Sequence, residues 1–444
     1  PTSRLDEFVE PTTRATRILY ACPNLHTSQR LVQLDIPTPT FTRAPGEASG
    51  SFGVESALDE LAWALKLDPV ELRLRNHADR DPEEDKPWGS KSLRECYRAG
   101  AERFGWSKRP DRVRATRDGH LLIGWGMATA AYPAGQRDAS ALARLRPDGT
   151  VLVQVGSQDL GTGTYTIMTQ IAADALGLPP DRVRFELGDT QMPEAPGSGG
   201  STTASTVGPA VKMACEALRA RLVEMSRTDA RSPLSGLAPD AIDVVDGALV
   251  ARAEPSRRDP LAELLRRSGK DEVTERVESK ATEARKAFSH YAFGAQFVEV
   301  AVDEDLGEVR VRRAVGAFAC GKILNAKTAR SQLVGGIIWG IGMALHEHTV
   351  RDERTGRVVT RDLADYHVPV NLDIPAIEII TIDEVDPHVN PIGAKGLGEI
   401  GITGVAAAIA SAIYHATGRR LRDLPMTPDR LLGLGAAVAG GGAP

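Results

Sequence analysis

The chain has 444 residues, of which 42% are hydrophobic and 25% are charged, an ordinary balance for a soluble globular protein. This length allows two or three domains. The formal net charge of −5 gives no electrostatic reason to expect a nucleic-acid partner. No run of about 18 apolar residues occurs, so we expect no membrane span.

The cysteines indicate what this chain does not hold by itself. Cys22, Cys96, Cys215 and Cys320 are far apart and form no C-x-x-C pair. This spacing argues against a zinc site, an iron–sulfur cluster or a disulfide framework in this chain, and favours reduced, mostly buried thiols. The first residue is Pro1 and no signal-peptide pattern follows it, so we expect a subunit or a piece of a longer precursor.

The first part of the chain is irregular and then helical. Residues 17–21 and 30–36 are short apolar runs that we interpret as strands of a sheet completed elsewhere. Helical spacing and a proline start predict helices over 52–66, from Asp68-Pro69 onward and over 87–105. A charged linker follows at 107–119. We place a domain boundary there, between residues 1–110 and 111–444.

After residue 120 strands and helices are mixed without a regular βαβ order, which predicts an α+β fold. Strands are predicted over 121–131, 139–146, 151–156, 182–187, 296–302 and 308–318. Helices are predicted over 164–176, 207–226, 328–348 and 402–416. The last two are apolar nearly all round and should be buried. The polar segment 228–285 is interpreted as a peripheral insertion.

Two glycine-containing loops are candidate anion sites. Residues 42–47 (TRAPGE) place Arg43 in a proline-stiffened loop before a helix, which favours an oxyanion clamp, with an ordinary exposed arginine as the alternative. Residues 156–164 (GSQDLGTGT) lie between a strand and a helix, where backbone N–H groups can approach an anion. This run is neither a G-x-G-x-x-G fingerprint nor a P-loop, so its spacing is not specific for phosphate.

Two further segments place polar groups beside helices. Residues 196–205 (PGSGGSTTAS) directly precede a long helix, which favours a loop around a phosphate-bearing ligand over a flexible linker. Gln332 lies inside the apolar helix 328–348 and needs hydrogen-bond partners there. A bound polar cofactor could supply them, and so could a backbone contact at a helix end.

The fifth segment ends in an acid. Residues 390–399 (NPIGAKGLGE) form a Gly-rich loop that brings Glu399 to the start of the apolar helix 402–416. A carboxylate held there in a partly dry pocket suits proton transfer near neutral pH. The alternative is a glutamate stabilised by the helix dipole. His346 and His348 are two residues apart on a helix and do not share a face, so we expect no metal site there.

Taken together and in this order, these segments resemble the molybdenum-cofactor-binding region of the xanthine dehydrogenase and aldehyde oxidoreductase family. The resemblance extends over roughly residues 40–432, with little contribution from 228–285. The segments that carry it are Arg43 to Gly46, Glu55 to Ala62, Asp68-Pro69, Arg73 to Asn76, Leu160 to Gly163 with Gln170, Gly188 to Thr190, 197–205, Phe293 to Ala295 with the hairpin to Val311, Asn325, Gln332 with Gly335-Gly336, Tyr366, Pro369, Asp373 to Pro375, Lys395 to Glu399 and Leu424-Pro425. Thr162 stands where the family usually has glutamine.

The resemblance implies the C-terminal part of the two-domain molybdopterin-binding region of a molybdenum hydroxylase. Glu399 would be the base that deprotonates a metal-bound hydroxyl group, whose oxygen attacks an aldehyde or an electron-poor ring carbon while hydride passes to a sulfido ligand. Arg43 would orient substrate or stabilise negative charge. Molybdenum would be held by the dithiolene of a molybdopterin mononucleotide or dinucleotide and not by protein ligands. The implied cofactor contacts are Leu160, Gly161, Thr162, Gly163, Gly199, Gly200, Ser201, Thr202, Thr203, Gln332, Lys395, Gly396 and Gly398.

The resemblance also implies partners. The family has a Gly-Gly-Gly-Phe-Gly-Gly loop and a whole domain before the arginine loop, and nothing before Phe41 matches either. We therefore expect another subunit, or the N-terminal part of the same precursor, to supply the missing half of the site. Electrons would leave through iron–sulfur clusters and usually a flavin, FAD, on partner chains. We expect a cytoplasmic protein, or a periplasmic one if a signal-bearing partner exports it.

Two other interpretations compete with this enzyme component. One is a non-catalytic remnant that keeps the fold and binds no cofactor, although the presence of both Arg43 and Glu399 argues against it. The other, suggested by the glycine loops alone, is a phosphate- or nucleotide-binding module. For the enzyme, Pro45 stands where an aromatic side chain would help to sandwich a purine, which favours aldehydes or other heterocycles as substrates.

Overall fold

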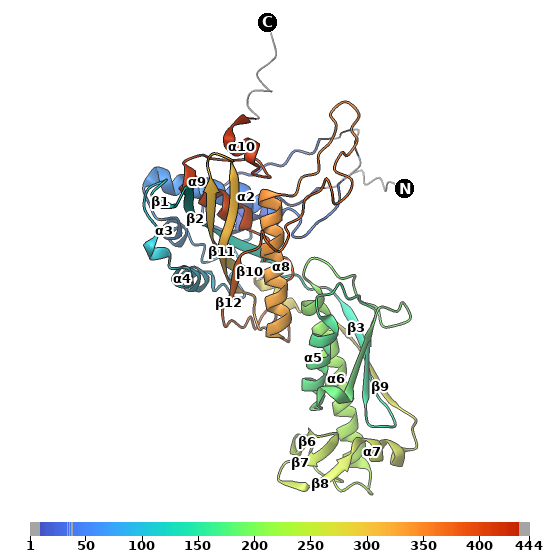
Figure 1. Ribbon diagram of the computed structural model, residues 1–444. Helices are drawn as coiled ribbons and strands as arrows, with labels where there is room; N and C mark the ends of the chain where they lie inside the picture. Colours follow the sequence, from blue (N-terminus) through green and yellow to red (C-terminus); the bar gives the residue numbers. More distant parts are fainter. Residues whose placement is uncertain (1–8, 33, 35, 37–38, 435–444) are drawn as a thin grey trace.

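The protein has two lobes joined end to end (Figure 1). The computed structural model describes residues 9–32, 34, 36 and 39–434. The first lobe contains a five-stranded sheet, and the second contains a four-stranded sheet with a small three-stranded sheet at its tip. This mixture of helices and sheets confirms the predicted α+β class. In the described residues, no helix is both long and apolar enough to cross a membrane.

The first lobe is organised around one long sheet. Its strands lie in the order β1 (Thr116–Asp118), β2 (Leu121–Pro133), β10 (Tyr291–Asp303), β11 (Glu308–Ala319) and β12 (Ala376–Thr381). All neighbours are antiparallel except β11 and β12, which are parallel. Alternate side chains of a strand face opposite sides of the sheet, so Phe293 and Phe297 join one core while Val298 and Val300 join the other.

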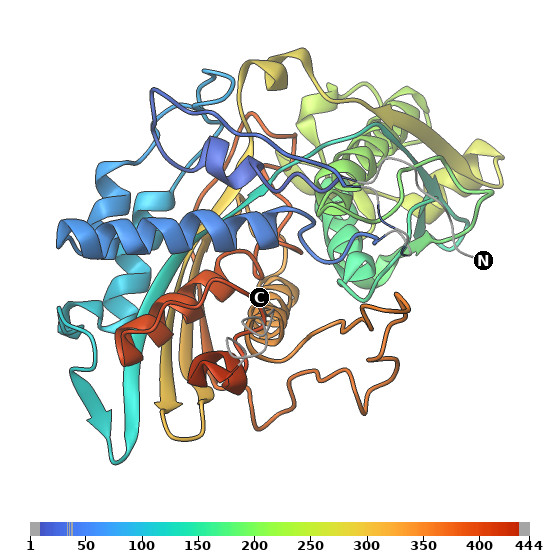
Figure 2. The ribbon, with the colours of Figure 1, turned by 90° about the horizontal axis from the view of Figure 1, so that it is seen from above.

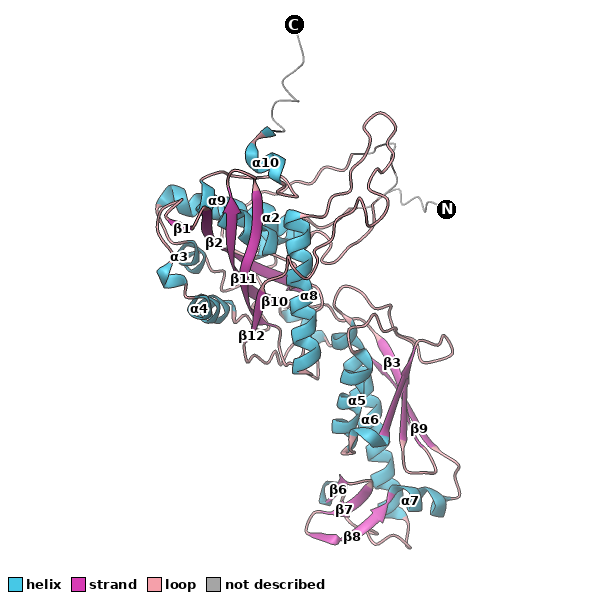
Figure 3. Cartoon of the chain, in the orientation of Figure 1, coloured by secondary structure: helices cyan, strands magenta, loops and turns pink. Residues whose placement is uncertain are grey.

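Helices cover both sides of this sheet. One side packs against α8 (Ala326–Leu345) and α9 (Val405–Thr417), and the other against α1 (Arg14–Ile18), α3 (Pro69–Arg75) and α4 (Leu93–Phe104). Helix α2 (Glu47–Leu65) contacts α1, α3 and α9 and runs alongside α9 (Figure 2). The lobe also includes the short helices η1 (Trp106–Lys108) and α10 (Pro428–Leu432). Residues 346–375, between α8 and β12, form a long arm without helices or named strands (Figure 3).

The second lobe packs two helices against its sheet. The strand order is β5 (Val183–Leu187), β4 (Val151–Val155), β3 (Ala139–Leu145) and β9 (Val273–Ser279). The helices are α5 (Thr164–Leu176) and α6 (Thr203–Thr228). The tip consists of β6 (Ile242–Val245), β7 (Ala248–Ala251), β8 (Glu254–Pro260) and α7 (Leu261–Ser268). Short helices η2 (Pro180–Arg182), η3 (Pro239–Ala241) and η4 (Glu283–Ala287) connect these elements.

Each strand and helix predicted after residue 120 is present, although several ends differ. The predicted insertion 228–285 contains the tip, but its last strand, β9, pairs with β3 along the four-stranded sheet. Helix α8 is buried on one face only, because its other face borders a cavity and leaves Trp339 41% exposed. The predicted complete burial of this helix was therefore wrong. The boundary at residue 110 stays a prediction.

Two strands predicted near the N-terminus are wrong. Residues 17–21 overlap helix α1, because Ala15 and Ile18 bury one helical face, and only Tyr20 forms a bridge, to His77. Of residues 30–36, those that the structure describes are not in a strand and are mostly exposed, whereas residues 33 and 35 lie outside the described residues. The described residues of this segment pair with no strand in the described part of the chain.

Helix α2 begins at Glu47, before the predicted residue 52. The prediction missed its first turn because the residues there have small side chains and form no apolar stripe. Gly50 is required there, since a Cβ atom would lie 2.0 Å from the Thr12 carbonyl oxygen.

His415 attaches α9 to the sheet through a fixed tautomer. Its Nδ1 atom accepts a hydrogen bond from the Trp125 N–H at 2.9 Å, and its Nε2 atom lies 3.1 Å from the Pro110 carbonyl, to which it donates. Burial and the nearby guanidinium of Arg109 lower the pKa of His415 to about 3. The folded chain therefore holds this imidazole neutral.

We predict an acid sensitivity that arises from His415. The unfolded chain takes up a proton as the pH falls below 6.5, while the folded chain does not until about 3, so this contribution to stability is present above pH 6.5 and is lost as the pH falls. In urea unfolding across this range, His415→Gln should lose less stability than the wild type, whereas exposed His120→Gln should behave like the wild type. Equal pH slopes in all three proteins would contradict the prediction.

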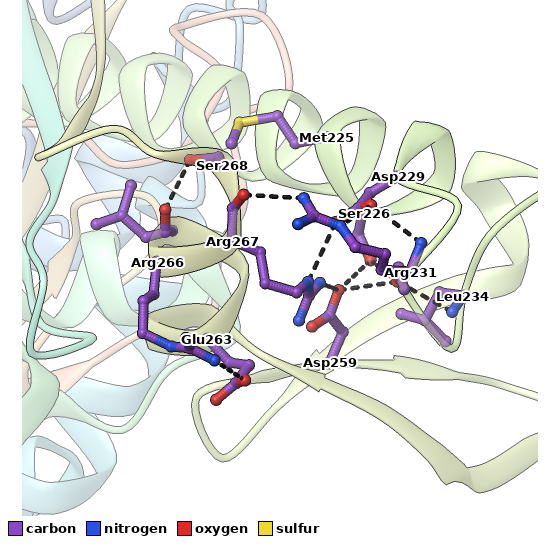
Figure 4. Close-up of polar contacts among 12 residues, drawn as sticks. Met225, Ser226, Asp229, Arg231, Leu234, Asp259, Glu263, Arg266, Arg267 and Ser268 are labelled. Atoms are coloured by element: carbon purple, nitrogen blue, oxygen red, sulfur yellow. Dashed lines mark hydrogen bonds and ion pairs between the residues drawn. The ribbon is translucent and has the colours of Figure 1, made fainter.

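Asp259 joins the tip to the end of α6 (Figure 4). Its fully buried carboxylate accepts hydrogen bonds from Ser226 at 2.7 Å and Ser232 at 2.8 Å, and pairs with Arg267 at 2.7 Å. Arg267 also contacts Asp229 at 3.1 Å. The carboxylate of Asp259, from β8, thus joins two serines, one from α6 and one from the following turn, to an arginine from α7.

We predict that Asp259→Ala lowers the free energy of unfolding by about 3 kcal/mol, because a partly buried guanidinium and two hydroxyl groups lose their acceptor. The measurement is the urea midpoint at unchanged m-value. The matched control is Asp243→Ala, which removes a half-exposed carboxylate paired with Arg219 and Arg252 and should cost about 1 kcal/mol or less. Similar losses in the two variants would refute a special role for Asp259.

Candidate functional site

A cavity of about 580 Å³ lies where the two lobes meet. It is bordered by the arginine loop, both glycine loops of the second lobe, the first turns of α5, α6 and α8, and residues 394–399. Twelve of the residues predicted as site residues border it, namely Arg43, Leu160, Thr162, Gly199, Gly200, Ser201, Thr203, Gln332, Lys395, Gly396, Gly398 and Glu399. Segments more than 350 residues apart in sequence, such as those of Arg43 and Glu399, thus form one site.

Three predicted contact residues, Gly161, Gly163 and Thr202, are not among the residues that line the cavity. Gly161 is one of two residues whose N–H groups bond to the Asp159 carboxylate, at 2.7 Å. Gly163 precedes α5 with a left-handed backbone (φ +85°), and a Cβ atom there would lie 2.7 Å from Thr328. Thr202 precedes α6 and donates to the Gly199 carbonyl at 2.9 Å. These residues shape the loops and do not face the cavity.

Three helix N-termini converge on the cavity. Thr164 and Ile167 belong to the first turn of α5, Thr203 and Ala204 to that of α6, and Thr328 to that of α8. The N–H groups at a helix start carry a partial positive charge and bind anions, phosphate in particular. The arrangement therefore favours a ligand with more than one anionic group.

Both oxygens of the Glu399 carboxylate are held by donors. The Ala44 N–H lies 3.1 Å from one oxygen, and the Ser201 hydroxyl lies 2.9 Å from the other. The Tyr132 hydroxyl, from β2, also hydrogen-bonds to Glu399, and burial together with this negative charge raises the pKa of Tyr132 well above its usual value. Tyr132 was missed in the sequence because it lies within an apolar strand and nothing in its spacing links it to residue 399.

Arg43 supports the loop that carries Glu399. Its Nε atom donates to the Gly398 carbonyl at 2.7 Å, and its Nη2 atom donates to the Gln332 carbonyl at 2.8 Å. Burial lowers the pKa of Arg43, although the charge of Glu399 partly opposes this. The Nη1 amino group has no hydrogen bond within the described part of the chain and remains available to a ligand. The Gln332 side-chain amide also borders the cavity without a partner among those residues.

The two lysines at the cavity differ in availability. The side chain of Lys395 is fully buried, with its ammonium nitrogen 2.8 Å from the Glu384 carboxylate, so its charge points away from the cavity. Lys322 also borders the cavity, and its ammonium group has no hydrogen-bond or ion-pair partner in the described residues. Lys322 was not among the predicted residues, since an isolated lysine after a strand carries no recognisable motif. Over the same described part of the chain, no three His, Cys, Asp or Glu side chains converge on a metal site.

Comparison with known proteins assigns this chain to a family. Residues 99–375 match the family model of the molybdopterin cofactor-binding domain, and residues 5–77 match a second model of the same description. The chain belongs to the molybdopterin cofactor-binding family. The family is described by its cofactor, molybdopterin, which is the cofactor that the sequence resemblance implied.

Two curated relatives of this molybdopterin-binding chain come from Escherichia coli O157:H7. The chain is 40% identical over 424 residues to the aldehyde oxidoreductase molybdenum-binding subunit PaoC, covering 95% of this chain and 56% of the relative. It is 32% identical over 422 residues to a xanthine dehydrogenase molybdenum-binding subunit, covering 91% of this chain and 54% of that relative. The chain thus spans about half the length of the curated relatives it matches.

Solved structures share the fold of this molybdopterin-binding chain. Quinoline 2-oxidoreductase from Pseudomonas putida 86 superposes with a TM-score of 0.78 at 24% identity, over 88% of this chain and 52% of the other. The aldehyde oxidoreductase from Desulfovibrio gigas gives a TM-score of 0.71 at 24% identity, over 88% and 41%. These likenesses confirm the predicted fold of a molybdenum hydroxylase region.

We predict that Gly396 cannot be replaced. A Cβ atom there would lie 1.7 Å from the Ser201 carbonyl oxygen, whereas one at Gly398 would meet nothing closer than the Ser201 hydroxyl at 3.4 Å. Gly396→Ala should lower the free energy of unfolding by about 1–3 kcal/mol or more, because backbone must move. Gly398→Ala, the matched control in the same loop, should stay close to the wild type. Urea unfolding of both variants tests this, and a tolerated Gly396→Ala would show that the loops need not touch.

Proposed function

We propose that this chain supplies the C-terminal part of the molybdenum site of a hydroxylase that oxidises an aldehyde, or hydroxylates an N-heterocycle, with oxygen derived from water. The observation that carries the proposal is the position of Glu399, which borders the same cavity as the first turns of α5, α6 and α8. A carboxylate base beside several anion-binding helix ends suits a phosphate-bearing cofactor next to a proton-transfer group.

The residues at the cavity fit molybdopterin with its nucleotide. The volume of about 580 Å³ lies within the range of small-molecule sites. The helix ends, the Lys322 ammonium and the Thr203 hydroxyl would hold the phosphates, and the Gln332 amide would hold a polar edge of the cofactor. The family glutamine is replaced by Thr162, whose hydroxyl lies 3.1 Å from that of Thr164. When bound, the cofactor supplies the metal that transfers water-derived oxygen and collects two electrons.

Glu399 acts as the base in this proposal. The Ala44 N–H and the Ser201 hydroxyl fix the orientation of its two carboxylate oxygens, and general base catalysis depends on such positioning. Arg43 holds the Gly398 carbonyl next to Glu399 and can offer its remaining Nη1 donor to substrate or to developing negative charge.

An aldehyde is the substrate class that we favour. The chain is 40% identical to a subunit named for aldehyde oxidation but 32% identical to one named for xanthine oxidation. Position 45, two residues after Arg43, carries Pro45 and not an aromatic side chain that could stack on a purine, although Trp339 and Tyr366 border the same neighbouring cavity of about 240 Å³.

A second polypeptide segment is needed to complete the site. The chain spans about half of its curated relatives, and apolar side chains on the arm 346–375 are exposed, including Leu363 at 79% and Leu372 at 83%. Such exposed apolar residues are typical of surfaces covered by another chain or domain. We propose that the missing half of the molybdenum site covers this arm, and that an iron–sulfur subunit and a flavin subunit carry the electrons away.

Metal analysis and a single variant test the proposal. In the complex purified with its partner chains, Glu399→Gln should keep the molybdenum content of the wild type and lose about 10²–10⁴-fold or more of its aldehyde-oxidising activity, because the base is gone. Glu378→Gln, which changes an exposed glutamate of β12, serves as the control and should keep its activity.

Two outcomes would favour the other interpretations. Absence of molybdenum from the intact complex would leave the family and the fold but remove the enzymatic role. Protection against unfolding by a free nucleotide, without molybdenum, would indicate a nucleotide-binding module.

A further inference from the structure

We propose that Lys395, with Glu384 and Asp386, is a positioning device that holds the Glu399 loop from the side turned away from the cavity. This inference rests on the proposed role of Glu399 as the base. It assigns to Lys395 a different task from the cofactor contact that the sequence suggested.

The first observation is where the Lys395 ammonium group lies. It is 2.8 Å from a Glu384 oxygen, 3.1 Å from the Ser90 carbonyl oxygen and 3.8 Å from an Asp386 oxygen. The side chains of Lys395 and Asp386 have no exposed surface, and that of Glu384 is 3% exposed. An ammonium group so enclosed cannot reach a ligand in the cavity.

The second observation is that both carboxylates are themselves anchored. Glu384 accepts hydrogen bonds from the N–H groups of Ser92, just before α4, and of Gly321, just after β11. Asp386 accepts from the N–H groups of His388 and Val389 and from the His290 ring.

These anchors favour the ionised form of both carboxylates. Burial alone would raise their pKa values, but the Lys395 charge and these hydrogen bonds hold the pKa of Glu384 and of Asp386 below the usual range. The lysine is therefore held between two ionised groups that are fixed to the first lobe.

The third observation is the short connection from Lys395 to Glu399. The Lys395 N–H bonds to the Cys320 carbonyl at 3.0 Å, Gly396 touches the Ser201 backbone, and Glu399 ends the loop with its own bonds to Ser201 and Ala44. The loop is thus held at one end by the buried ion pair and at the other by the groups that orient the carboxylate. A shift at Lys395 would move Glu399 relative to substrate, and small misplacements of a catalytic group lower rates strongly.

The experiment compares Lys395→Met, Glu384→Gln and the double variant in the complete, molybdenum-loaded complex. Three quantities are measured: kcat and KM for an aldehyde, molybdenum content, and the hydrogen–deuterium exchange of the amides of residues 393–399. Lys212→Met is the matched control, because Lys212 donates to the Pro391 carbonyl of the same segment from an exposed position.

We expect Lys395→Met to lower kcat by about 10–100-fold with KM and molybdenum content unchanged, as is typical when a supporting hydrogen bond is lost. Amide exchange in 393–399 should become at least about tenfold faster, since the segment opens locally more often. The double variant removes the uncompensated Glu384 charge and should regain thermal stability but not kcat. Lys212→Met should match the wild type in all measurements.

Three results would overturn the inference. One is loss of molybdenum in proportion to activity in Lys395→Met, which would mean that Lys395 serves cofactor binding. Another is full recovery of kcat together with stability in the double variant, which would mean a purely structural ion pair. The third is unchanged kcat and amide exchange in Lys395→Met.

Failure of the proposed function would look different from these results. It would appear as absent molybdenum in the wild type or as undiminished activity in Glu399→Gln, whatever the Lys395 variants do.

Discussion

The contact between Gly396 and the Ser201 backbone sets the distance between the two lobes at the site. No side-chain atom fits there, since a Cβ atom would lie 1.7 Å from the Ser201 carbonyl oxygen. Ser201 has a positive φ of 54°, and its hydroxyl donates to Glu399. The same residue therefore packs its backbone against Gly396 and orients the Glu399 carboxylate with its side chain. Around this contact, Ile392 joins the core of the second lobe while Ile400 joins that of the first. The segment 390–400 therefore connects two cores and presents Glu399 at their junction.

The electrostatics of the cavity follow from this junction. Helix α8 comes from the first lobe and α5 and α6 from the second, and only their meeting brings three helix N-termini to one space. Within that space, Lys322 contributes a cation that has no partner among the described residues, and Arg43 keeps its Nη1 donor toward the cavity, whereas the ammonium group of Lys395 is directed into the protein. The result is a cavity whose backbone dipoles suit an anionic ligand and which still accommodates the Glu399 carboxylate, because neutral donors hold it.

Buried ionic groups recur as structural connections in this chain, each at a place where separate elements meet. Asp259 joins the tip to α6, Glu384 joins the start of α4 to the Glu399 loop, and Glu55 pairs with Arg73 between α2 and α3 with both side chains fully buried. Such groups are costly to bury unless every donor and acceptor has a partner. They therefore add orientation more than net stability, which suits a protein whose site is assembled from distant segments.

Much of this protein can be predicted from its sequence because the signals are local. Hydrophobic spacing identified α5, α9 and the strand pair β10–β11, and the glycine loops with Arg43 and Glu399 located the cavity wall, since a left-handed or tightly packed backbone requires glycine. Only the tertiary structure decided which way side chains point. Lys395 and Lys322 are equally cationic in the sequence, but one is buried against Glu384 and the other faces the cavity. Tyr132 meets Glu399 only because β2 passes beneath the start of α9, a contact between distant residues that no local spacing contains.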